Sequence, residues 1–119
     1  MVAAAVWVLT IAAGAGTVLA LWHLRATDGV ARPPLVAGIT HGIVGAAGLA
    51  VLLLALRGPA RGVGAGVGSF GIVSAVLFAG AVLTGIVMLL LRRKGVVMAI
   101  HAGVAITGYT LLLAWSSLG

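Results

Sequence analysis

The sequence contains no cysteine and only one acidic residue, Asp28. Without cysteine the chain forms no disulfide, holds no metal through thiolates and performs no thiol chemistry. Without a second carboxylate it lacks the carboxylate pair of many acid–base catalysts, and no Ser-His-Asp set or hydrolytic metal motif is present. We therefore expect no hydrolase chemistry.

Charged residues of either sign are also scarce. They make up 7% of the chain, whereas 63% is hydrophobic, which leaves too little polar surface for a soluble domain. A membrane-spanning helix needs about 20 mostly apolar residues. The stretches of this kind are residues 2–24, 35–56, 69–91 and 95–118. We expect an all-α integral membrane protein, with one domain over residues 1–119 embedded in the lipid bilayer.

The connections between these stretches predict the topology. They are ten, twelve and three residues long, so neighbouring helices run antiparallel in an up-down-up-down four-helix bundle. Five basic residues belong to the first and third connections, and they are Arg25, Arg32, Arg92, Arg93 and Lys94. Only Arg57 and Arg61 belong to the second. The larger group predicts the cytoplasmic side of a bacterial-type inner membrane, with both termini outside, and lipid headgroups rather than nucleic acid as its partner.

The second and fourth stretches resemble each other. Residues 36–53 aligned with residues 96–113 are identical at six positions, which are Val36/Val96, His41/His101, Val44/Val104, Gly48/Gly108, Leu52/Leu112 and Leu53/Leu113. The first and third stretches match more faintly at a spacing of 67, as in Thr17/Thr84. We expect two parallel hairpin repeats, residues 1–56 and 69–118, related by a pseudo-twofold axis along the membrane normal.

His41 and His101 are the most informative residues of this repeat. Each lies six residues, or about 9 Å, inside its helix on the basic side. Helices two and four form a diagonal of the bundle, roughly 11–14 Å across when neighbouring axes are 8–10 Å apart. A lone buried histidine would most simply hydrogen-bond a neighbouring helix. Two matched imidazoles in a bilayer, where polar groups are costly, instead indicate one shared ligand between them.

Both histidines lie on stripes of small residues. Gly45 and Gly48 follow His41 at helical spacing, and Gly108 follows His101. The first stretch adds Gly14 and Gly16, and the third adds Gly80 and Gly85. Close packing of membrane helices explains such glycines equally well. The alternative is that they let a flat macrocycle approach the backbone.

The segments HGIVGAAG, His41–Gly48, and HAGVAITG, His101–Gly108, resemble the transmembrane b-type cytochromes. In that family a four-helix bundle carries haem b between histidines on facing helices, with glycines where the porphyrin meets the backbone. The resemblance implies one haem b per chain, with His41 and His101 as axial iron ligands and Gly45, Gly48 and Gly108 beside the macrocycle. Haem propionates would point to the basic side, where Arg25 and Arg92 occupy equivalent positions.

The resemblance implies electron transfer or haem handling. Electron-carrying members of the family usually have two haems and four histidine ligands, and this chain has no second pair. A single site near one face is not a complete transmembrane electron path. We expect an electron carrier without its own substrate site. Such a carrier would need a redox partner or a second copy of the chain. A homodimer is possible because GxxxG-like patches suit close helix packing between chains.

Three alternatives remain open at this point. The first is a zinc or copper site in which His23 adds a third imidazole, although the diagonal gap is expected to be too wide for a bare ion with bonds of about 2.0–2.1 Å. His23 is expected to anchor the end of the first helix, and Met88 and Met98 to pack. The second is a small metal or solute transporter, which would lack a membrane-embedded acid because Asp28 is in a loop. The third is a structural subunit of a membrane complex.

Overall fold

The computed structural model describes residues 1–26, 31–91 and 95–119, and its regular elements are all helices. They are α1 (Val2–Arg25), α2 (Leu35–Ala55), α3 (Phe70–Leu91) and α4 (Val96–Leu118). Every helix end lies within one residue of its predicted position. All four helices are long and apolar enough to cross a membrane. The all-α four-helix prediction is therefore confirmed for the described residues.

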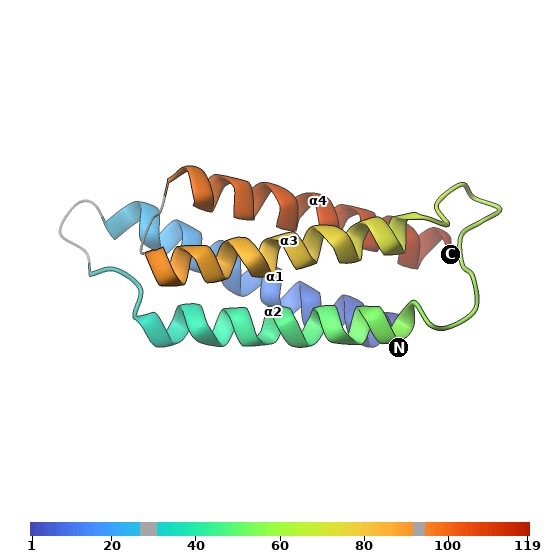
Figure 1. Cartoon of the computed structure of the whole chain (residues 1–119), viewed down its shortest axis with the longest axis horizontal. Coiled ribbons are helices and arrows are strands. Elements are labelled where there is room, and N and C mark those ends of the chain that lie inside the picture. The colour runs from blue at the N-terminus through green and yellow to red at the C-terminus, as the bar shows by residue number, and fades with distance from the viewer. Residues whose placement is uncertain (27–30, 92–94) are drawn as a thin grey trace.

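The helices lie side by side along the long axis of a molecule of 52 × 21 × 21 Å, and both termini are at one end (Figure 1). Each helix reverses the direction of the one before it. α1 packs most closely on α2, and α3 on α4, while the α2–α3 and α1–α4 interfaces are sparser. The diagonal pairs α1/α3 and α2/α4 make no close backbone approach within the described residues. The expected up-down-up-down bundle is thus observed.

Proline and glycine determine where the helices begin and how they are connected. Pro34 precedes α2 in an extended conformation. Gly95 precedes α4 at φ 77°, a backbone conformation that residues with a side chain rarely adopt. In the α2–α3 connection, the Val67 amide donates to the Gly62 carbonyl at 2.9 Å, and the Val67 side chain is buried. The connection is thus a set of turns around the buried Val67 side chain.

The core occupies the half of the bundle that carries the termini. Its members are Ala5, Leu9, Leu52, Ala75, Phe78, Leu112 and Trp115. Ser74 is also buried there, and its hydroxyl donates to the Gly108 carbonyl at 2.7 Å. This hydrogen bond satisfies a polar group inside an apolar interface and joins α3 to α4.

The core stops short of the basic end of the bundle. In α1 and α3 the buried positions end at Ala12 and Ala81. In α2 and α4 they begin only at Gly48 and Gly108. Between these positions and the basic end, no described helical residue is buried. The bundle is therefore closely packed in one half and more open in the other.

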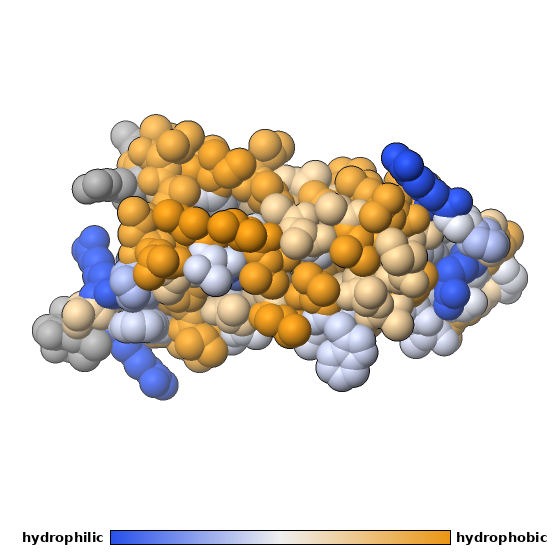
Figure 2. Space-filling model, turned by 90° about the horizontal axis from the view of Figure 1, so that it is seen from below, coloured by the Kyte–Doolittle hydropathy of each residue, from blue (hydrophilic) through white to orange (hydrophobic). Residues whose placement is uncertain are grey.

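The outer surface is largely apolar. Figure 2 shows hydrophobic residues over most of one face, with hydrophilic residues gathered at both ends. Large side chains such as Trp7, Ile43 and Val96 are 69%, 65% and 75% exposed. Apolar exposure on this scale is unfavourable in water and matches the hydrocarbon of a bilayer.

Candidate functional site

His41 and His101 meet inside the open half of the bundle. Their ring centroids are 6.1 Å apart, and the ring planes form an angle of 79°. α2 and α4 are on a diagonal and do not approach through their backbones, so these two side chains bridge the space between them. The structure thus brings together the two histidines that the repeat singled out.

This separation corrects the prediction that the diagonal is too wide for a bare ion. With metal–nitrogen bonds of about 2.0–2.1 Å and about 1.1 Å from each nitrogen to its ring centre, a metal held linearly between two imidazoles separates the centroids by about 6.3 Å. The observed 6.1 Å is close to this value. The prediction was wrong because it used the distance between the helix axes, whereas the two imidazole side chains extend from their helices toward each other.

The His101 ring is held in one orientation by α3. Its Nδ1 lies 2.8 Å from the Ala81 carbonyl and 3.1 Å from the Thr84 hydroxyl. A carbonyl oxygen only accepts hydrogen bonds, so Nδ1 carries the proton and donates it. The neutral ring then has its lone pair on Nε2, which is the form of histidine that binds a metal through Nε2. The Thr84 hydroxyl can accept from Nδ1 while it donates to the Gly80 carbonyl, 2.9 Å away.

The His41 ring has a different environment. Its Nδ1 is buried and has no hydrogen-bond partner among the described residues. The Ala12 carbonyl of α1 lies near the ring, but no hydrogen bond of ordinary geometry joins it to Nδ1. An unpaired buried polar atom costs free energy, so His41 is less firmly placed than His101.

Glycines of α1 and α3 contact the two rings. A Cβ added at Gly16 would lie 2.8 Å from Cε1 of His41, which no real Cβ contact tolerates. A Cβ added at Gly85 would lie 3.5 Å from Cε1 of His101, an ordinary contact. In the sequence, these two glycines are only two of many small residues in the first and third stretches. No feature of the sequence alone shows that they face the histidines.

The glycines predicted to line the site have different surroundings. A Cβ at Gly48 would lie 2.6 Å from Cδ2 of Leu9, and one at Gly108 would lie 3.1 Å from Cβ of Leu77. Both glycines therefore serve the close packing of α1 on α2 and of α3 on α4. Gly45 has no atom within 4 Å of such a Cβ, and it lies one turn from His41. Of the three, Gly45 alone has space beside it.

Contacts in α1 and α3 recur at a spacing of 69 residues. Gly16 faces the first imidazole as Gly85 faces the second. Thr17 and Thr84, which the sequence matches at 67, have different surroundings. Thr17 is exposed and donates only to the backbone of its own helix, whereas Thr84 contacts His101. The spacing of 67 therefore pairs two threonines with different contacts, whereas the spacing of 69 pairs the glycines beside the rings.

The remaining candidates lie near the basic end. Arg25 ends α1, is exposed and borders a shallow hollow with Val18, Leu21 and Trp22. Arg92 falls outside the described residues. Within the described residues no three histidine or acidic side chains come close enough to share a metal, so His23 does not complete a three-ligand site. Met88 and Met98 are partly buried.

The functional residues that sequence reasoning missed are Ala81 and Thr84. Ala81 acts through its backbone carbonyl, which leaves no signal in the sequence. Thr84 was noted only for its match with Thr17, and its contact with His101 depends on how α3 packs on α4.

Comparison with protein-family models, with curated proteins and with solved structures finds no match. Any functional assignment therefore rests on the residues of this chain.

Proposed function

We propose that this chain is a membrane cytochrome of the b type that binds one haem through His41 and His101 and serves electron transfer or haem handling. The observation that carries the proposal is the pair of imidazoles, 6.1 Å apart on diagonal helices, in the half of the bundle without buried residues. The hydrogen bond from Nδ1 of His101 to the Ala81 carbonyl supports the proposal, because a proton on Nδ1 leaves the lone pair of Nε2 available to bind iron.

The number of protein ligands favours haem over a bare ion. Zinc in proteins is almost always four-coordinate, and sites with fewer than three protein ligands are unusual. The described residues offer two imidazoles and no third ligand close by. Haem iron receives its four equatorial nitrogens from the porphyrin and needs only axial ligands from the protein. Two facing histidines are therefore the right donor set for haem.

The glycines around the pair support the same ligand. Axial ligands lie on the two faces of a macrocycle, so the macrocycle edges would point toward α1 and α3, the other diagonal of the bundle. Gly16 and Gly85 lie on these helices beside the rings, where their missing Cβ atoms leave room for the two imidazoles that the proposed haem needs as ligands. Gly45 adds open space one turn from His41. Gly48 and Gly108 act indirectly, by keeping the helix pairs close.

We place the chain in a bacterial-type inner membrane, with the basic end cytoplasmic and the termini outside. The excess of arginine and lysine at the end opposite the termini supports this orientation. Spacings of 60 residues between α2 and α4 and of 69 between α1 and α3 support two parallel hairpin repeats about a pseudo-twofold axis. Arg25 and Arg92, near the cytoplasmic surface, would then neutralise the haem propionates.

Absorption spectroscopy tests the proposal. Protein produced with ample haem and purified in neutral detergent should show a sharp Soret band and α and β bands on reduction, with one haem per chain. A ratio of one half would mean that two chains share a haem. His41→Ala and His101→Ala should each abolish the spectrum of bis-histidine iron, and the matched control His23→Ala should keep it. A colourless protein contradicts the proposal, and one equivalent of zinc or copper in that protein would establish the ion site instead.

A further inference from the structure

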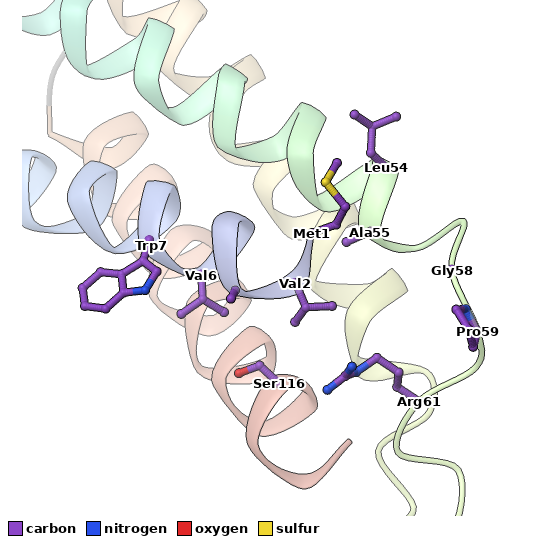
Figure 3. A pocket seen from close by; sticks show the side chains of 11 residues that line it. Met1, Val2, Val6, Trp7, Leu54, Ala55, Gly58, Pro59, Arg61 and Ser116 are labelled. Atoms are coloured by element: carbon purple, nitrogen blue, oxygen red, sulfur yellow. The ribbon is translucent and has the colours of Figure 1, made fainter.

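A groove opens at the end of the bundle opposite the histidines (Figure 3). Its volume is about 740 Å³, and the first turns of α1, the end of α2, the connection after α2 and the end of α4 border it. Leu54 of this groove lies thirteen residues after His41 in α2, which is about 20 Å along the helix. The groove is therefore separate from the proposed haem site.

Among the described residues, Arg61 is the one charged side chain that lines the groove. Its Nε is buried and donates no hydrogen bond to any described residue. In Figure 3 the side chain extends from the connection toward Val2 and Ser116. An arginine stays charged at all physiological pH values, so a buried unpaired donor on it is unfavourable until an anion accepts from it. The only acidic side chain in the sequence, Asp28, is outside the described residues, and the nearest chain end, Gly119, packs on Cβ of Arg61.

Apart from Ser116, the other side chains that line the groove are apolar. Val2, Val6 and Trp7 line it along α1, and Leu54 and Ala55 line it at the end of α2. Trp7 is 69% exposed, so this apolar lining continues onto the surface that would meet the hydrocarbon of a bilayer. A ligand that satisfies both parts has an anionic head at Arg61 and an apolar tail along α1.

We propose that the groove binds one anionic phospholipid, with its phosphate at the Arg61 guanidinium and an acyl chain along Val6 and Trp7. Arg61 follows the end of α2, at the level where headgroups meet a spanning bundle. The apolar lining favours a lipid over free phosphate, since a free anion would leave it uncovered. The inference needs membrane insertion and is independent of the haem.

Arg57 provides a matched control. It is four residues before Arg61 in the same connection, is exposed, and does not line the groove. The full chain and its Arg61→Gln, Arg61→Lys and Arg57→Gln variants are reconstituted into vesicles of neutral phosphatidylcholine. Increasing fractions of brominated phosphatidylglycerol are then included, and quenching of tryptophan fluorescence measures how often the lipid occupies the groove. Trp7→Phe identifies the part of the signal that comes from Trp7.

We expect the wild-type chain and Arg57→Gln to be half-quenched at the same fraction of phosphatidylglycerol. Arg61→Gln should need about fivefold more lipid, which corresponds to the roughly 1 kcal/mol that one basic residue contributes at a membrane surface. The fraction of phosphatidylglycerol that half-quenches Arg61→Lys should lie between these values, because lysine keeps the charge but lacks the planar array of guanidinium N–H donors. Brominated phosphatidylcholine should quench all variants equally and more weakly.

Equal quenching of the wild-type chain by the two lipids would overturn the proposal without the use of any variant. If Arg61→Gln and Arg57→Gln lose quenching by phosphatidylglycerol to the same extent, the proposal is also overturned. The lipid would then respond to the total positive charge of the surface and not to a site at Arg61. Relief of quenching by millimolar inorganic phosphate at constant ionic strength would assign the site to a free anion. A chain that carries no haem still gives all these readouts, so failure of one proposal is distinguishable from failure of the other.

Discussion

The two hairpins of the bundle, α1–α2 and α3–α4, are packed alike and hold their histidines differently. Gly48 and Gly108 are both buried against the partner helix of their own hairpin. At the rings the two hairpins differ, because His101 donates to the Ala81 carbonyl and contacts Thr84, whereas Nδ1 of His41 is buried and has no hydrogen-bond partner among the described residues. The comparison indicates that His101 is the anchored ligand of the proposed pair and His41 the adjustable one.

A single residue accounts for part of this difference. At the spacing of 69 that relates α1 to α3, the counterpart of Thr84 is Ala15, which has no hydroxyl. The α1–α2 hairpin also packs more tightly around the His41 ring, since Gly16 lies closer to His41 than Gly85 lies to His101. The two hairpins therefore have similar packing, but their histidines have unequal surroundings.

Removal of each imidazole should have the largest effect and should reveal the inequality. We expect His101→Ala to retain less than a tenth of the haem, because the oriented ligand is lost. His41→Ala should keep a larger fraction as five-coordinate, high-spin haem on His101. The Soret position and haem content of the purified variants measure this. Equal haem contents and identical spectra in the two variants would remove the distinction between anchored and adjustable ligands.

Alanine at the two ring-facing glycines should have the next largest effect. Gly16→Ala places a Cβ 2.8 Å from the His41 ring, so the ring must move, and overpacking of this kind costs about 1–3 kcal/mol. Gly85→Ala makes only an ordinary contact at 3.5 Å and gains up to about 1 kcal/mol of helix propensity. Haem titration of the apoproteins should show weaker binding in Gly16→Ala alone. Weaker binding in Gly85→Ala to the same extent would refute the asymmetry.

Alanine at the packing glycines should lower stability and leave haem binding intact. Gly48→Ala conflicts with the fully buried Leu9, and Gly108→Ala presses on Leu77, so each should destabilise the bundle by about 1–2 kcal/mol. The midpoint of thermal unfolding in detergent measures this, and the haem content of folded protein serves as the control. A loss of haem at unchanged unfolding temperature would show that these glycines line the macrocycle after all.

The smallest effects should come from the hydroxyl at position 84. Thr84→Val removes one contact of His101 but keeps the bond to Ala81, so haem affinity should fall by about threefold to tenfold, the equivalent of one hydrogen bond. Ala15→Thr would add a hydroxyl to the α1–α2 hairpin, which carries His41, and should raise the affinity for haem by a similar factor. If the threonine merely packs, Thr84→Val should leave the affinity unchanged.

The sequence alone determined the helices, their order and the choice of histidines. Long apolar stretches of spanning length admit only helices whose backbone groups are satisfied internally, and each predicted end was correct within one residue. The internal repeat singled out His41 and His101, because matched polar residues are conspicuous in an apolar chain. Both conclusions depend on properties that are local in the sequence.

The tertiary structure decided which groups surround the imidazoles. Gly16, Gly85 and the Ala81 carbonyl meet the rings only because α1 packs on α2 and α3 on α4 in a particular register. Interdigitation of side chains sets that register, and a periodic apolar sequence fits several registers almost equally well. For the same reason the sequence matched the first and third helices at a spacing of 67, whereas the glycines beside the rings are 69 residues apart. The lone pair on Nε2 of His101 follows from a backbone carbonyl, which every residue carries and no sequence pattern marks.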